Sequence, residues 1–235
     1  MTYKLFRGWP KPFLWYQRRV RVFAWYAAVA FCVAGCASGS GPPTATSAAP
    51  SGQVNPANIE RVQGELPAGY EVADMSGRAA PLAFWGFGPD WTAEPPQCGA
   101  LADPVADGAS TRGWSGSGVG GIVYAVVTGP QVPFDPALIA ECGRWTLASG
   151  HTTGTVTLVP APTVYGAATV GMATEATTVV EGDTHTSSRA HTVTAYLGDY
   201  LAFVTVVTDP GSPKPVLGQD FASALFVKTL SALRG

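Results

Sequence analysis

The sequence predicts an α+β domain in which an antiparallel β-sheet has helices packed on one face. Two apolar segments, residues 192–197 and 200–208, are separated only by Gly198-Asp199, which is the spacing of a two-residue β-hairpin. Other short segments rich in β-branched residues alternate between apolar and polar positions, as half-buried strands do. An amphipathic pattern over residues 219–233 indicates a helix that covers the sheet.

The first 35 residues have the pattern of a signal peptide. Six cations and no acid accompany an uncharged apolar stretch over residues 22–35. As a helix, this stretch would span roughly 21 Å at 1.5 Å per residue, whereas a bilayer core is roughly 30 Å thick. The stretch is therefore short for a membrane span and typical of the apolar region of a signal peptide.

The apolar stretch ends in the segment VAGC, formed by Val33, Ala34, Gly35 and Cys36. This segment resembles the lipobox of bacterial lipoproteins, whose small residues fit a peptidase cleft. The resemblance implies cleavage before Cys36 and thioether lipidation of its thiol, so that fatty chains such as palmitate hold the chain on the outer side of the cell membrane. The alternatives are an uncleaved anchor and a plain secretory signal.

Residues 36–53 are expected to be a lipidated, flexible linker of Gly, Ser, Pro, Thr and Ala, because they offer no apolar area to offset the cost of ordering. Residues 54–235 contain no internal repeat and no second linker, which predicts a single extracytoplasmic domain. Residues 36–235 hold eight cations and all sixteen acids, a net charge of −8. This charge opposes nucleic-acid binding, which needs a basic face.

Five strands are predicted from apolar runs and alternation, over residues 122–127, 155–159, 177–181, 192–197 and 200–208. The last is apolar on both faces, as a central strand is. Gly198 suits a type II′ turn because glycine accepts a positive φ at the first loop position.

Two helices are predicted from capping residues at a helix end or from apolar residues at helical spacing. Asp135-Pro136 provides an N-cap and a proline at the first helical position, which predicts a helix over residues 137–147. The C-terminal helix places Ala222, Phe226, Leu230 and Leu233 on one stripe. Residues 58–63 suggest a short helical turn, and the glycines and prolines between residues 76 and 118 predict mostly loops.

Two of the four cysteines remain for the domain. Cys32 falls within the signal peptide and Cys36 is the lipid acceptor, which leaves Cys98 and Cys142. An even pair in an exported domain favours a disulfide, which would close a loop of about 45 residues and add roughly 4 kcal/mol in the chain-entropy picture. A free reactive thiol or a metal-binding pair are the alternatives, although neither cysteine lies in a CxxC motif or near a histidine.

The segments PPQC (residues 95–98) and CGRW (residues 142–145) resemble the extracellular sensor domain of a mycobacterial membrane-bound serine/threonine kinase and its lipoprotein relatives. The lipobox, the linker of small residues and the ending LFVKTLSALRG are similar to mycobacterial lipoproteins that carry an uncharacterised domain. The resemblance implies an α+β fold, a Cys98–Cys142 bridge and a cell-envelope ligand. The sensor domain has two bridges, whereas this chain can form one.

Four aromatic residues are the candidate ligand contacts, and they gather among glycines and prolines: Phe84, Trp85, Phe87 and Trp91. Exposed rings of this kind hold a sugar or an acyl chain. The other interpretation is that they cap a core beneath a long loop, because exposed apolar patches are uncommon.

The sequence offers no nucleophile–base set, phosphate loop or metal-ligand spacing, so we expect no catalytic residue, no metal and no cofactor. The GxGxxG pattern at residues 116–121 precedes a strand instead of following one, which favours a flexible loop over a dinucleotide site. His185 and His191 would face each other if a turn were centred near Ser188. That placement allows a weak metal site, and the alternative is a solvated hairpin end.

The sequence thus favours a lipid-anchored envelope lipoprotein whose non-catalytic domain works as a ligand-binding or sensor-like module. Its expected partners are the membrane, through the lipid anchor, and an unknown envelope ligand or protein, with no nucleic acid. The first alternative is an acyl-lipid carrier with a cavity between sheet and helix. A cell-wall hydrolase is a less favoured alternative.

Overall fold

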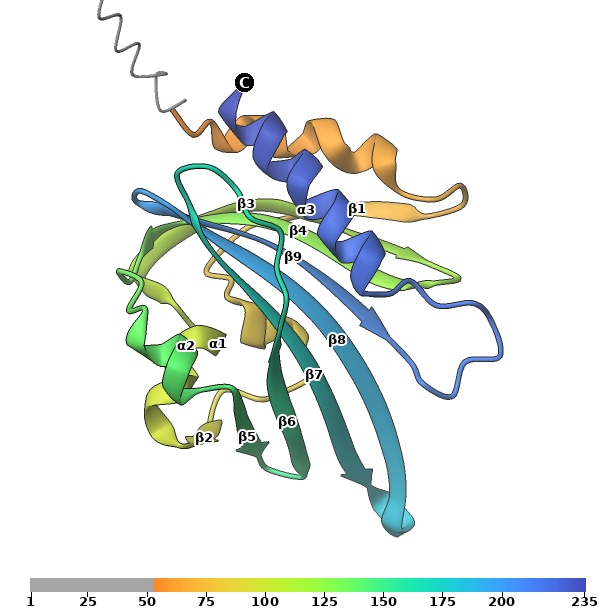
Figure 1. Cartoon of the computed structure of the whole chain (residues 1–235). Coiled ribbons are helices and arrows are strands. Elements are labelled where there is room, and N and C mark those ends of the chain that lie inside the picture. The colour runs from red at the N-terminus through yellow and green to blue at the C-terminus, as the bar shows by residue number, and fades with distance from the viewer. Residues whose placement is uncertain (1–52) are drawn as a thin grey trace, which may run out of the picture. The chain divides into compact units, whose positions relative to one another are not determined.

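A computed structural model describes residues 53–235. The predicted signal peptide, the lipobox with Cys36 and the linker as far as residue 52 lie outside the described residues. The sheet has nine antiparallel strands in the order β1-β3-β4-β9-β8-β7-β6-β5-β2 (Figure 1). The strands are β1 (Glu71–Met75), β2 (Thr92–Glu94), β3 (Val105–Gly118), β4 (Gly121–Gln131), β5 (Arg144–Ser149), β6 (Thr152–Val159), β7 (Ala168–Val180), β8 (Thr184–Leu197) and β9 (Tyr200–Thr208).

Helical segments cover parts of both faces of the sheet. The 3₁₀ segment η1 and helix α3 lie side by side over one face, whereas α1 and α2 lie on the other (Figure 1). These segments are η1 (Pro56–Glu65), η2 (Pro81–Phe84), η3 (Pro96–Cys98), α1 (Gly99–Ala102), α2 (Ala137–Glu141), η4 (Glu181–Asp183) and α3 (Gln219–Arg234). The predicted α+β class and its antiparallel sheet are confirmed. Helices lie on both faces rather than on one, and α2 on the second face corresponds to the start of the predicted helix over residues 137–147 (Figure 1).

The β8–β9 hairpin forms as its sequence predicts. Leu197 pairs with Tyr200, and Gly198 has a φ of 60°, a value that side-chain-bearing residues rarely adopt. Strand β9 coincides with the predicted segment 200–208 and is buried on both faces. It pairs with β4 and β8 and so lies inside the sheet, which explains why its apolar run shows no alternation.

Helix α3 confirms the predicted C-terminal helix and fills the space over its face of the sheet. Its predicted stripe is buried completely or nearly so: Ala222, Phe226, Leu230 and Leu233. These side chains pack against buried residues of the central strands, among them Val204 and Val206 of β9. Within residues 53–235, no helix combines the length and the apolar character needed to cross a membrane.

The predicted helix over residues 137–147 is wrong beyond its first turn. Helix α2 ends at Glu141, and strand β5 begins at Arg144. Trp145 and Leu147 are buried while their neighbours are exposed, which is the period of a strand. The helical spacing of Leu138 and Trp145 is therefore coincidental, because the two residues belong to different elements.

The prediction of loops up to residue 118 is wrong for residues 105–118, which form the long strand β3. Its glycines permit close packing, because a Cβ on Gly116 would clash with Leu66 and one on Gly118 would clash with the ring of Tyr70. The GxGxxG segment is accordingly the β3–β4 hairpin and not a flexible loop. Glycines here leave room for the side chains of Leu66 and Tyr70, so a glycine-rich segment does not indicate a loop at this place.

Strands β1 and β2 follow each other in the chain but lie at opposite edges of the sheet. Residues 76–91, which we call the crossing segment, must therefore pass over one face from the β1 edge to the β2 edge. This segment contains all four of the aromatic residues that the sequence singled out. Their contacts follow from the strands that the crossing segment passes.

Candidate ligand pocket

The crossing segment is fixed to the sheet by successive contacts with different strands. The Ala79 amide donates to Thr111 Oγ1 of β3 at 3.1 Å. The ring of Phe84 stacks on Tyr124 of β4 with centroids 4.2 Å apart. Further along, Trp85 Nε1 donates to Thr192 Oγ1 of β8 at 3.0 Å. The side chains of this segment are thus held by packing and hydrogen bonds along its length.

The structure buries the four aromatic residues to different depths. Trp85 is only 1% exposed and belongs to the core, and Phe84 is half-buried over the sheet. Phe87, which is 8% exposed, and the partly buried Trp91 also pack in this core, and both line a pocket at the far end of the crossing segment. The interpretation as core therefore holds for Trp85 and Phe87, although Phe87 also lines the pocket together with the partly buried Trp91.

The pocket has a volume of about 370 Å³, which is within the range of roughly 300–1,000 Å³ common for small-molecule sites. Its apolar wall comes from the crossing segment, and its polar wall is an ion pair. The residues that define it are Arg78, Leu82, Phe87, Pro89, Trp91 and Asp103. Both apolar side chains and charged groups therefore contribute to its lining, and a few convergent polar groups are what fixes a ligand's orientation in a binding site.

The ion pair joins the start of the crossing segment to the residue after α1. Arg78 Nη2 lies 2.8 Å from Asp103 Oδ1 and also donates to the Val105 carbonyl oxygen at 2.9 Å. Two acceptors from one short segment therefore fix the orientation of the guanidinium. An exposed ion pair of this kind adds little stability, so its main effect is to hold polar groups in place.

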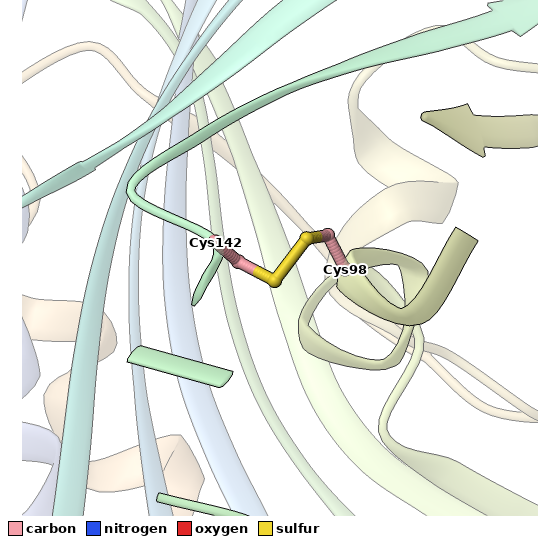
Figure 2. The surroundings of a disulfide bond; sticks show 2 residues. All are labelled: Cys98 and Cys142. Carbon is pink, nitrogen blue, oxygen red and sulfur yellow. A yellow bond between two sulfur atoms is a disulfide. The ribbon is translucent and has the colours of Figure 1, made fainter. Parts of the chain in front are cut away.

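A disulfide between Cys98 and Cys142 fixes the segment before Asp103, which is the one described lining residue from outside the crossing segment. Both cysteines are fully buried, and their Cα atoms are 5.5 Å apart. Figure 2 shows the bond joining the turn before α1 to the segment that leads into β5. The bridge thus ties the segment that precedes Asp103 to the body of the sheet.

Titratable groups near the sheet are shifted mainly by burial. Burial raises the pKa of Tyr124, and it raises the pKa of Tyr196, which packs on Phe134, to about 12. Burial lowers the pKa of His191, and the positive charge of Arg189 lowers it further. The tyrosines stay protonated and the histidine stays neutral near pH 7, so these groups supply uncharged packing surface.

The predicted encounter of His185 with His191 is wrong. The turn between β7 and β8 is η4, at residues 181–183, and not near Ser188. His185 pairs with Val179 and His191 pairs with Ala173, so both histidines belong to one strand. In the part of the chain that the structure describes, no three His, Cys, Asp or Glu side chains gather as a metal site.

Two other depressions have a different character. One, of about 470 Å³, lies where residues 53–58 meet the end of α3. The other, of about 450 Å³, lies on the β5–β7 face and is lined largely by threonines. Neither joins two aromatic rings to an ion pair, so the pocket at the crossing segment is the better candidate.

Sequence reasoning missed Arg78 and Asp103. They are 25 residues apart, and Asp103 shows no sequence pattern that signals a partner. Arg78 does stand just ahead of the aromatic residues, but a single cation in a glycine-rich stretch carries no specific signal. Only the path of the crossing segment brings the two side chains together.

These features define a disulfide-bonded α+β domain with a ligand-sized pocket on one face of an antiparallel sheet. The chain belongs to the family described as "Domain of unknown function (DUF5642)", whose model matches residues 55–234. No curated protein matches the sequence.

Two solved structures are similar. An uncharacterized protein from Mycobacterium smegmatis, an ortholog of Rv0999, aligns over 79% of this chain and 100% of its own, with 19% identity and a TM-score of 0.60. The extracellular domain of PknH from Mycobacterium tuberculosis aligns over 77% of this chain and 91% of its own, with 12% identity and a TM-score of 0.44. The first likeness shows a shared fold.

Proposed function

We propose that this protein is a lipid-anchored, non-catalytic binding module on the outer face of the cell membrane, and that its ligand occupies the pocket of Arg78, Phe87, Trp91 and Asp103. The single observation that carries the binding function is the meeting of aromatic side chains and a fixed ion pair in one pocket. Sites of this composition select small ligands by shape and by a few hydrogen bonds.

The lipid anchor is supported by the sequence before the domain. The segment ending in Cys36 combines a cationic start, an apolar stretch and small residues before the cysteine. The disulfide between Cys98 and Cys142 fits an oxidising compartment outside the cytoplasm. Both features favour export, and the lipidated cysteine would keep the domain at the membrane surface.

The alternative of an acyl-lipid carrier has weaker support. It needs an apolar cavity between the sheet and a helix, but the space under α3 holds buried side chains such as Phe226 and Leu230. The pocket at the crossing segment has a charged wall, which an acyl chain would desolvate without providing hydrogen bonds. The binding module is therefore the better supported function.

The anchor is tested in cells that express the full-length chain and receive labelled palmitate. We expect label in the wild-type protein and none in Cys36→Ser. A membrane-impermeant amine-reactive biotin should modify Lys214, which is exposed, in intact cells. Equal palmitate incorporation in Cys36→Ser, or Lys214 labelling only after lysis, would contradict the proposal.

The binding function is tested by ligand-observed NMR of the purified full-length protein with a panel of small neutral, charged and aromatic probes. We expect at least one probe to bind in a way that Trp91→Ala weakens tenfold or more. Tyr165→Ala is the matched control, because Tyr165 is an aromatic residue 88% exposed and outside the pocket. If no probe depends on Trp91, the pocket is not a binding site.

A further inference from the structure

The polar wall of the pocket is neutral as a whole. Arg78 and Asp103 are the charged residues that line it in the described part of the chain, and they form one ion pair. A ligand with a formal charge would meet a like charge beside every opposite charge. Coulomb attraction therefore gives such a ligand little advantage, and the wall favours an uncharged partner.

The ion pair nevertheless leaves hydrogen-bonding groups free. Arg78 Nη2 uses its two hydrogens on Asp103 Oδ1 and the Val105 carbonyl oxygen. Across residues 53–235, no protein acceptor takes the hydrogens of Arg78 Nε and Nη1, and no protein donor reaches Asp103 Oδ2. The Arg78 side chain is 43% exposed and that of Asp103 is 20% exposed, so both are accessible from the pocket.

These free groups offer donors and an acceptor side by side. A guanidinium only donates, and an ionised carboxylate only accepts. A hydroxyl group does both, so two neighbouring hydroxyls on one ligand can accept from Arg78 and donate to Asp103 together. The polar wall is therefore complementary to a vicinal diol, and hydrogen bonds to charged groups are the stronger kind.

The aromatic part of the lining suits the apolar part of such a ligand. Trp91 and, to a smaller extent, the largely buried Phe87 contribute aromatic surface to the lining, and the faces of aromatic rings carry partial negative charge. A pyranose ring has C–H groups, which carry partial positive charge, on its faces and hydroxyls around its rim. Its C–H groups would pack on the aromatic wall while its hydroxyls reach the ion pair.

We propose that the pocket binds a neutral pyranose unit, either as a free sugar or as part of a glycan chain. This inference rests on the proposed binding function and specifies the chemical class of its ligand. The volume of about 370 Å³ is near the lower end for ligand sites, so the pocket suits a short segment rather than a long polymer.

The experiment uses the full-length protein and four kinds of probe. The neutral sugar probes are maltotriose, mannotriose and chitotriose, each compared with its monosaccharide. The others are galacturonic acid trimer as an anion, glucosamine trimer as a cation and dodecyl maltoside as an acyl chain that carries a sugar. Saturation-transfer NMR and calorimetry measure binding, and thermal melts confirm that each variant is folded.

We expect at least one neutral sugar to bind, with Trp91→Ala weakening its affinity tenfold or more. Asp103→Asn should weaken it severalfold, because an amide replaces one acceptor oxygen with a donor. Arg78→Lys should also weaken binding severalfold, because an ammonium group cannot reproduce the planar, forked set of donors of a guanidinium. Tyr165→Ala should leave binding unchanged. If Trp91→Ala does not fold, Asp103→Asn and Arg78→Lys still test the site.

The outcomes separate the two proposals. Binding of neutral sugars that depends on Trp91 and Asp103 supports both, and a preference for trisaccharides over monosaccharides identifies a glycan chain rather than a free sugar. If only the charged probes or the dodecyl chain bind through Trp91, the sugar proposal is overturned while the binding module stands. If no probe depends on Trp91, both proposals are overturned.

Discussion

The six-membered ring of Trp91 lies directly against Gly99, the first residue of α1. A Cβ added to Gly99 would come within 2.9 Å of Trp91 Cη2 and Cζ3. Gly99 has a φ of −57°, so its backbone tolerates a side chain and only the tryptophan requires a glycine. Gly154 of β6 has a similar relation to Phe87, whose Cζ would lie 2.8 Å from an added Cβ.

Gly99→Ala should displace Trp91 without altering the local backbone. Overpacking of this kind typically costs about 1–3 kcal/mol, so the free energy of unfolding should fall by that amount. Denaturant unfolding measures the change, and near-ultraviolet circular dichroism reports the tryptophan environment. Gly64→Ala is the control, because nothing lies within 4 Å of its Cβ position. Equal stability and spectra for both variants would contradict the close packing.

Removing the disulfide should destabilise the domain substantially. The bond joins residues 44 apart in sequence, and loss of such a bridge from a small domain typically costs about 2–5 kcal/mol. The double variant Cys98→Ala/Cys142→Ala should therefore melt well below the wild type under oxidising conditions. Reductant during the melt should lower the melting temperature of the wild type and leave the double variant unchanged; a response of the double variant to reductant would refute the assignment.

The hydrogen bond between Trp85 and Thr192 should make a measurable contribution inside the core. Thr192→Val removes the acceptor of Trp85 Nε1, and a buried donor left without a partner costs about 1–3 kcal/mol. Trp85→Phe should then cost less in the Thr192→Val background than in the wild type, since the bond is already lost. Thr153→Val, at an exposed threonine of β6, is the control. Additive effects in this double-mutant cycle would show that the bond contributes nothing.

Stability should depend on pH through His191. Its pKa in the folded protein is below the usual 6.5 because burial and Arg189 both disfavour its charged form. At a pH between the lowered pKa of the folded protein and the value of about 6.5 in the unfolded chain, the unfolded chain binds more protons than the folded protein. The free energy of unfolding therefore rises with pH in this range, and the contribution of His191 levels off above about 6.5. The imidazole Nδ1 is buried without a hydrogen-bond partner among the described residues, which adds to the cost of protonation.

His191→Gln should remove this part of the pH dependence. Melting temperatures measured from pH 7.5 down to 5 should fall less steeply in the variant than in the wild type. His185→Gln serves as the control, because that side chain is exposed on the same strand. Parallel curves for wild type and His191→Gln would show that His191 does not titrate on unfolding.

Local sequence patterns were sufficient where neighbouring residues decide the structure. The β8–β9 hairpin depends on Gly198 and on two adjoining strand segments, and α3 depends on the helical spacing of its own apolar residues. The helix predicted over residues 137–147 failed because strand pairing of β5 with β6 overrode a helical spacing. Strand β3 was missed because its glycines are explained only by side chains from elsewhere, such as Leu66 and Tyr70.

The sequence by itself determined the α+β class, the antiparallel hairpin, the C-terminal helix and the pair of cysteines left for a bridge. These features follow from the spacing of apolar residues, from the residues that form turns and from the composition, and none of them needs contacts between distant parts of the chain. Only the tertiary structure decided how the aromatic residues divide between the core and the lining of a pocket, with Phe87 in both. That division depends on β1 and β2 lying at opposite edges of the sheet, which sends residues 76–91 across its face and brings Arg78 to Asp103.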